Sequence, residues 1–135
     1  MKQQSQFAGK LRVVIIGAGF AGLSAARSLA ESPVDIILID KHNYHLFQPL
    51  LYQVATAALS PAQIAQPIRA IMRKQNNCTT ELDEVTGVDT TRKMVLSHAY
   101  EIPYDYLIVA TGAAHDYFGH SKFLYQWHEV VMADL

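Results

Sequence analysis

The sequence predicts an α/β domain in which a parallel sheet is combined with a small β-hairpin. Two observations lead to this prediction. Short apolar runs alternate with a stretch that has the apolar periodicity of a helix, and a glycine-rich turn separates the first run from that stretch. Two later segments, joined by a polar turn, have the composition of strands. With 135 residues, half of them apolar, the chain is long enough for one domain with a hydrophobic core.

The first forty residues predict a β-α-β unit. Residues 11–16 (LRVVII) are apolar and mostly β-branched, as expected for a strand that is buried on both faces. Helical spacing of apolar residues predicts a helix over 21–31, which Pro33 is expected to end. Residues 34–40 (VDIILID) predict a second buried strand. Two such strands joined through a helix are parallel, with a right-handed crossover.

Two short helices are predicted in the middle of the chain. Residues 60–63 (Ser-Pro-Ala-Gln) supply an N-cap serine, a proline at the first helical position and a capping-box glutamine. Pro67 is expected to interrupt this helix and to open a second one over 68–75 (IRAIMRKQ), which ends near residues 76–77.

The remaining strands are predicted in the second half of the chain. Residues 84–89 (EVTGVD) and 93–98 (KMVLSH) are read as a hairpin with a polar turn at 90–92. Residues 106–110 (YLIVA) form another apolar run, which Thr111 and Gly112 end. We expect four segments to be neighbours or near neighbours in one parallel sheet, namely 11–16, 34–40, 84–89 and 106–110.

A glycine motif carries the strongest functional signal. Gly17, Gly19 and Gly22 stand in G-x-G-x-x-G register between the first strand and the first turn of the helix. There the glycines allow a tight turn, close backbone approach to a pyrophosphate, and close helix–strand packing. Asp40 ends the second strand, 18 residues after Gly22 (40 − 22), where a carboxylate reaches the ribose of an adenosine. The alternative is an ordinary glycine-rich turn with a solvated aspartate. The context favours dinucleotide binding.

Composition excludes several other classes of function. The net charge of −1 leaves no basic surplus for nucleic acid or anionic lipid. No apolar segment precedes Leu11, so we expect no secretory signal. The one cysteine, Cys78, cannot form an internal disulfide, which favours a reducing compartment. The six histidines show no metal-binding spacing, so no metal site is predicted.

One segment is unusual because it has no charged residue. Residues 42–68 contain no Asp, Glu, Lys or Arg, but they hold three prolines and four glutamines. A membrane span needs about 20 mostly apolar residues and tolerates such residues poorly. We therefore interpret the segment as the wall of a buried cofactor site.

Three segments resemble a known family. They are DKHNYHLFQPLLYQVATAALSPAQIAQPIR, EVTGVD and YDYLIVATGAAHDYFGH. Together with the N-terminal glycine motif they resemble the type II NADH dehydrogenases, single-subunit FAD enzymes that pass electrons from NADH to a membrane quinone. The resemblance runs from residue 12 to residue 120 and implies a Rossmann-like FAD-binding domain that is incomplete.

The resemblance also implies roles for individual residues. Residues 17–21 would hold the pyrophosphate and Asp40 the ribose, while Lys41 and His45 would contact the cofactor beside it. Val85 would meet the adenine end, and residues 48–57 would lie near the isoalloxazine. The cofactor-binding residues predicted are Gly17, Ala18, Gly19, Phe20, Ala21, Gly22, Asp40, Lys41, His45, Val85, Ala110, Thr111 and Gly112. No catalytic residue is predicted, because hydride transfer to a flavin is the chemistry of the cofactor.

The resemblance implies further partners and a location. A full-length member would use NADH and quinone, could form a homodimer, and would sit on the cytoplasmic face of a membrane through its C-terminal region. The FAD-binding domain is expected over residues 1–120. Residues 121–135 (SKFLYQWHEVVMADL) do not resemble the family and are interpreted as an atypical tail, from a frameshift, a truncation or a fragment.

Two alternatives stay open. One is an FAD- or ADP-binding fragment without turnover. The other is a different two-domain flavoprotein, such as a ferredoxin or disulfide reductase. A disulfide reductase needs a redox-active cysteine pair, and residues 40–69 contain no cysteine. The same argument disfavours a sulfide:quinone oxidoreductase.

Overall fold

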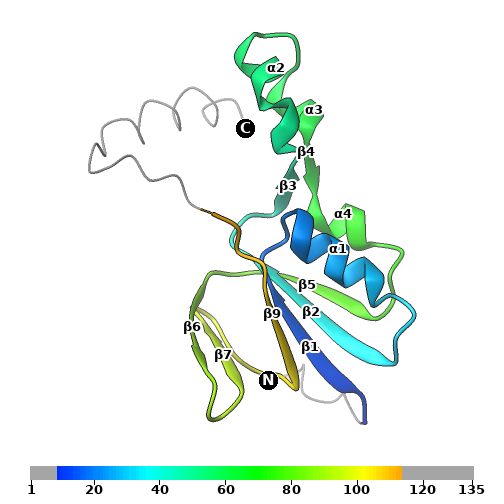
Figure 1. Cartoon of the computed structure of the whole chain (residues 1–135), viewed down its shortest axis with the longest axis vertical. Coiled ribbons are helices and arrows are strands. Elements are labelled where there is room, and N and C mark those ends of the chain that lie inside the picture. The colour runs from blue at the N-terminus through cyan, green and yellow to red at the C-terminus, as the bar shows by residue number, and fades with distance from the viewer. Residues whose placement is uncertain (1–8, 114–135) are drawn as a thin grey trace. The chain divides into compact units, whose positions relative to one another are not determined.

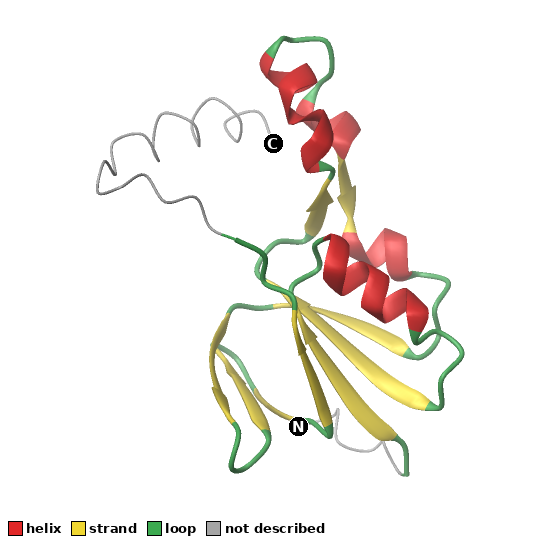
Figure 2. Cartoon of the chain, viewed as in Figure 1, coloured by secondary structure: helices red, strands yellow, loops and turns green. Residues whose placement is uncertain are grey.

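A computed structural model describes residues 9–113 of the chain, so the atypical tail predicted over 121–135 lies outside the described residues. The described chain divides into two compact units. The first contains residues 9–43 and 68–112, and the second contains residues 44–67 with Ala113. Helices and strands of both units are coloured in Figure 2.

The first unit is built on a four-stranded parallel sheet with the strand order β5-β2-β1-β9 (Figure 1). Its strands are β1 (Leu11–Ile16), β2 (Val34–Asp40), β5 (Cys78–Leu82) and β9 (Tyr106–Val109). The strands predicted over 11–16, 34–40 and 106–110 are confirmed as members of this sheet. An α/β fold with a parallel sheet is therefore confirmed.

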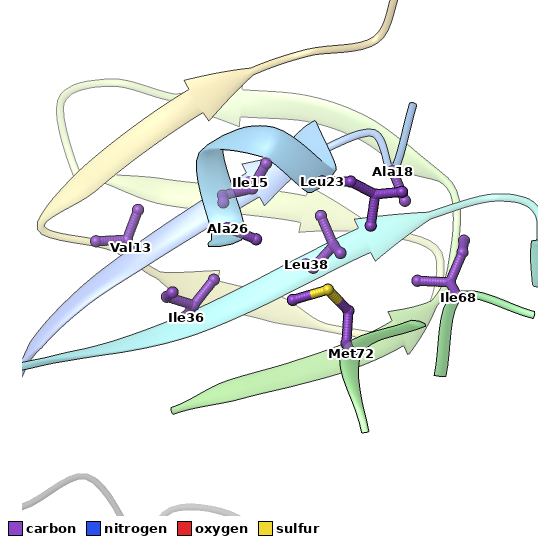
Figure 3. Packing of buried hydrophobic residues seen from close by; sticks show 9 residues of the cluster. All are labelled: Val13, Ile15, Ala18, Leu23, Ala26, Ile36, Leu38, Ile68 and Met72. Atoms are coloured by element: carbon purple, nitrogen blue, oxygen red, sulfur yellow. The ribbon is translucent and has the colours of Figure 1, made fainter. Parts of the chain in front are cut away.

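Two helices cover one face of this sheet, α1 (Phe20–Ser28) and α4 (Ile68–Met72). The side chains between the helices and the sheet form a single buried cluster, shown in Figure 3. Its members are Val13, Ile15, Ala18, Leu23, Ala26, Ile36, Leu38, Ile68 and Met72. Alternate residues of β1 and β2 supply this cluster because successive side chains of a strand point to opposite faces.

A three-stranded antiparallel sheet supplies the core on the other face. Its strands are β6 (Val85–Asp89), β7 (Met94–Ser97) and β8 (Glu101–Pro103), in the order β6-β7-β8. The second buried cluster joins Val95 of β7 to the remaining inward residues of β1 and β2, which are Val14, Ile16, Ile37 and Ile39. The predicted hairpin is confirmed, and β8 extends it into a meander.

The second unit contains the uncharged segment. Its elements are β3 (Tyr44–Leu46), the 3₁₀ helix η1 (Gln48–Leu50), α2 (Leu51–Ala55), α3 (Pro61–Ile64) and β4 (Ala65–Pro67). The helix start predicted at residue 60 is confirmed, because the side chain of Gln63 accepts the amide of Ser60 at 2.7 Å. Strands β3 and β4 pair antiparallel, which the sequence did not predict. In the described part of the chain, no helix has the length and apolarity to cross a membrane.

The prediction that residues 84–89 join the parallel sheet is wrong. The fourth parallel strand is β5, which the sequence analysis did not find. Strand β5 (CTTEL) is an edge strand, so its polar residues can face solvent and no apolar run marks it. Strand β6 (VTGVD) alternates half-buried and exposed positions, which is typical of an antiparallel strand with one face in water.

Both helices of the first unit are shorter than predicted. Helix α1 ends at Ser28 rather than near Pro33, and α4 ends at Met72 rather than near residue 76. The last turn of α1 tightens, because the Leu29 amide donates to the carbonyls of both Ala25 and Ala26. The side chains of Gln75 and Asn77 donate to the carbonyls of Ala26 and Leu29, so these carbonyls at the end of α1 have partners outside the helix.

One side chain is buried among the described residues of β6, β7 and β8. Val95 is fully buried in the second cluster, whereas Val88 on the neighbouring strand is 36% exposed. We expect Val95→Ala to lower the free energy of unfolding by about 2 kcal/mol, because it removes two buried methyl groups and leaves a cavity. Val88→Ala is the matched control and should cost less than about 1 kcal/mol. Equal losses of unfolding free energy for Val95→Ala and Val88→Ala in urea denaturation would contradict the burial of Val95 in the second cluster.

Candidate dinucleotide-binding site

The predicted site residues of the first unit gather at the carboxyl edge of the parallel sheet. Backbone hydrogen bonds tie the strand ends together there. The Gly17 amide donates to the Ile39 carbonyl at 2.7 Å, and the Ala110 amide donates to the Ile16 carbonyl at 2.8 Å. The loops that follow β1, β2 and β9 therefore leave the sheet side by side, as ligand-binding loops do in open α/β sheets.

Two glycines allow this loop to pack without side chains. Gly17 has a φ of 99°, in the left-handed region that favours glycine, and a Cβ there would overlap the carbonyl group of Ala110. A Cβ on Gly22 would overlap the carbonyl oxygen of Gly17. Both positions are therefore restricted to glycine by the fold itself, before any ligand is considered.

The third glycine of the motif is different. Gly19 is the N-cap of α1, and a Cβ built on it would meet no atom within 4 Å. The fold therefore does not require glycine at this position, whereas a ligand that approaches the backbone would. No side chain caps the helix at Gly19, and its first turn contains no acidic residue. The positive end of the helix dipole there favours a nearby anion.

Asp40 links this loop to the end of β2. One carboxylate oxygen accepts the amide of Ala18 at 2.6 Å, and the other accepts the amide of His42 at 2.7 Å. The side chain is 17% exposed, and the ring Nδ1 of His42 lies 3.5 Å from the second oxygen. Because an ionised carboxylate has about four acceptor positions, Asp40 keeps capacity for further donors such as ribose hydroxyls.

Comparison with known proteins identifies the family. Residues 11–130 match the family described as pyridine nucleotide-disulphide oxidoreductase. The chain belongs to this family. Type II NADH:quinone oxidoreductase Ndh of Mycobacterium tuberculosis is 52% identical over 116 residues, which cover 83% of this chain and 25% of that protein. The resemblance of the sequence to the type II NADH:quinone oxidoreductases is thereby confirmed.

Solved structures agree with this family. NDH2 from Plasmodium falciparum, solved in complex with NADH, is 29% identical with a TM-score of 0.74 and covers 82% of this chain and 24% of its own. The sulfide:quinone oxidoreductase of Aquifex aeolicus is 25% identical with a TM-score of 0.76, covering 84% of this chain and 27% of its own. This chain spans about a quarter of the length of the curated relatives named Ndh and NdhA.

Other predicted cofactor residues of the family occupy the same edge. Phe20 and Ala21 begin α1 as exposed residues, and Lys41 directly follows Asp40. Val85 lies two residues after Asp83, whose amide donates to the Asp40 carbonyl at 3.0 Å. Ala110, Thr111 and Gly112 follow β9, and Gly112 has a φ of 71°. The structure thus places these residues in the first turn of α1, in the loops after β2 and β9, and at the start of β6.

His45 belongs to the second unit, as do residues 48–57. It lies on β3, where it pairs with Gln66 of β4. Its contact with a cofactor, and that of residues 48–57 with an isoalloxazine, stay predictions.

One residue at this edge was missed from the sequence. Leu82 ends β5, is 56% exposed and is the register partner of Asp40, so its side chain lies on the same face of the sheet. An exposed leucine beside the candidate ribose-binding carboxylate offers an apolar contact to a nucleoside. No signal in the sequence marked it, because β5 itself was not recognised.

The cysteine of this chain lies in the sheet. Cys78 begins β5, is free, and packs against the first buried cluster. Burial raises the pKa of its thiol to about 11, so the thiolate is scarce near neutral pH. Within residues 9–113, no three His, Cys, Asp or Glu side chains are grouped so that they could hold a metal ion.

The glycine geometry predicts unequal effects of two alanine substitutions. Gly22→Ala should lower the free energy of unfolding by about 3 kcal/mol or more, because its methyl group would overlap the Gly17 carbonyl. Gly19→Ala should cost less than about 1 kcal/mol, since its methyl group meets open space. Urea denaturation of the two variants measures both values. A Gly22→Ala variant as stable as Gly19→Ala would contradict the close packing.

Proposed function

We propose that this chain forms the FAD-binding part of a type II NADH:quinone oxidoreductase, and that it holds the adenosine and pyrophosphate end of the cofactor. The whole enzyme would take NADH as electron donor and a membrane quinone as acceptor. It would act as a peripheral protein at the cytoplasmic face of the membrane.

The observation that carries this proposal is the environment of Gly19. The fold leaves open space where its Cβ would be, at the N-terminus of a helix with neither a capping side chain nor an acidic first turn. That combination favours a ligand anion close to the backbone, as in dinucleotide sites. Family membership and the similarity to Ndh favour FAD and the quinone reaction among the possible dinucleotide functions.

In this proposal, residues around the glycine loop would contact successive parts of the cofactor. Asp40 would accept ribose hydroxyls with its remaining lone pairs, and Val85 with Leu82 would offer apolar contact to the adenine. The N-terminus of α1 would face the pyrophosphate, because the positive end of a helix dipole favours a bound anion. A bound flavin would supply the redox chemistry, and the protein groups here would supply position and electrostatics.

A second candidate function is an FAD- or ADP-binding module without turnover. It concerns these 135 residues as given, whose matched part spans about a quarter of the relatives Ndh and NdhA. These 135 residues contain one G-x-G-x-x-G motif, whereas the two-dinucleotide flavoproteins that the chain resembles use a second one for NADH. The two candidates differ in electron transfer and agree on the nucleotide site.

Removal of the Asp40 carboxylate tests the ribose contact. Asp40→Ala should weaken FAD binding by about 1–3 kcal/mol, or roughly fivefold to 150-fold in Kd, through lost charge-assisted hydrogen bonds. Asp35→Ala is the matched control, because it removes the same group at the other end of β2. Flavin fluorescence titration measures both.

Because Asp40 also holds the Ala18 amide, a second ligand separates the two roles. The intact chain should prefer ADP to 2′-deoxy-ADP, and Asp40→Ala should lose that preference if the carboxylate binds ribose. A preference retained in Asp40→Ala would assign the ribose contact to another group.

Electron transfer distinguishes the two candidate functions. With added FAD, the purified 135-residue chain should bind the cofactor, yet it should oxidise NADH no faster than free flavin with a soluble quinone. Donor and flavin must be held about 3–3.5 Å apart for fast transfer, and no donor-binding motif is present in these residues. NADH absorbance with and without quinone measures this. Robust quinone-dependent oxidation would overturn the module reading, and absence of FAD binding would contradict both candidates.

A further inference from the structure

Two amide side chains hold the C-terminal end of α1. The Gln75 Nε2 group donates to the carbonyl of Ala26 at 2.7 Å and to the Asn77 Oδ1 atom at 2.9 Å. The Asn77 Nδ2 group donates to the carbonyl of Leu29 at 2.9 Å and to that of Ser32 at 3.2 Å. All four amide hydrogens are used, three of them on carbonyls at or just beyond the end of the helix. We call these two residues the amide clamp.

The amide clamp also fixes itself to the sheet. The backbone carbonyl of Asn77 accepts the amide of Ile36 at 2.8 Å, and the Gln75 amide donates to Met72 at the end of α4. The clamp therefore joins α1, α4 and the start of β2 through hydrogen bonds. Both side chains are part-buried, where such bonds contribute more than they do in water.

The opposite end of α1 is the candidate pyrophosphate site. Gly22 holds that end by lying against the Gly17 carbonyl, which fixes one point on the helix axis. Leu23 and Ala26 hold the helix on the sheet through apolar contacts, which are not directional and constrain its tilt less than hydrogen bonds do. The helix has nine residues and is about 13 Å long, so a small rotation about Gly22 would be felt at both ends. The hydrogen bonds of the amide clamp at the C-terminal end therefore help to set the direction of the helix axis, and with it the direction of the N-terminal amides.

We propose that Gln75 and Asn77 are positioning residues, which aim the N-terminus of α1 at the pyrophosphate of the bound dinucleotide. This inference rests on the proposed function, because it requires that the glycine loop binds a dinucleotide. Neither side chain touches the ligand in this proposal. They act through the helix axis, from the end that lies farthest from the site.

The proposal predicts a selective loss of affinity. ADP carries the pyrophosphate that the helix amides would meet, whereas adenosine carries only the groups expected to contact Asp40 and its neighbours. Asn77→Asp keeps the shape of the side chain, removes both donors and places a negative charge against the negative end of the helix dipole. It should weaken ADP binding about tenfold and change adenosine binding by less than about twofold.

The test uses the full 135-residue chain and NMR titration with ADP and with adenosine. Asn76→Asp is the matched control, since it makes the same change one residue away on an exposed side chain. It should leave both affinities within about twofold of the unaltered chain. Gln75→Glu serves if Asn77→Asp does not fold, because it keeps the bonds from Asn77 to Leu29 and Ser32.

The outcomes separate the possible failures. A lower population of folded chain would reduce the apparent affinities for ADP and for adenosine by the same factor. Such parallel losses of affinity would overturn the positioning role. Unchanged ADP affinity in the variants would overturn it as well. If the unaltered chain bound neither ADP nor FAD, the proposed function would be wrong, and this inference, which rests on it, would be wrong too.

Discussion

The structure depends on the close approach of three backbone segments at Gly17. There the carbonyl of Ala110 and the backbone of Gly22 occupy positions that side chains would block. Because no Cβ intervenes, β1 passes directly into α1, and β9 lies beside both. The helix N-terminus is consequently brought to the edge of the sheet, where three loops meet. Packing in the first unit and the geometry of the candidate site thus follow from one constraint.

The two faces of the parallel sheet form the hydrophobic core, and its carboxyl edge carries the candidate site. Alternate residues of β1 and β2 enter the two buried clusters, one under the helices and one under the antiparallel meander. With both faces covered, the carboxyl edge is where loops can meet a ligand. Gly19 and Asp40 both lie there. Gly19 has space that a side chain could fill, and Asp40 ends β2 with lone pairs left for further donors.

The sequence predicted the elements whose chemistry is local. The apolar runs at 11–16 and 34–40, the glycine motif and the helix start at Ser60 each carry their own signal, and the structure contains all of them. Strand β5 was missed because an edge strand can be polar, and the end of α1 was misplaced because Gln75 and Asn77 end it from about 48 residues away. Leu82 could not be identified without β5. The pairing of β5 with β2 and the end of α1 both depend on residues that are distant in the sequence.

In the function proposed here, the glycine loop and the N-terminus of α1 bind the pyrophosphate of a dinucleotide. Backbone amide resonances of the isotopically labelled chain test this most directly during titration with ADP. We expect the largest shifts on the amides of residues 18–23, with smaller shifts at His42 beside Asp40. Saturable ADP binding that leaves these resonances in place, and moves others instead, would contradict it.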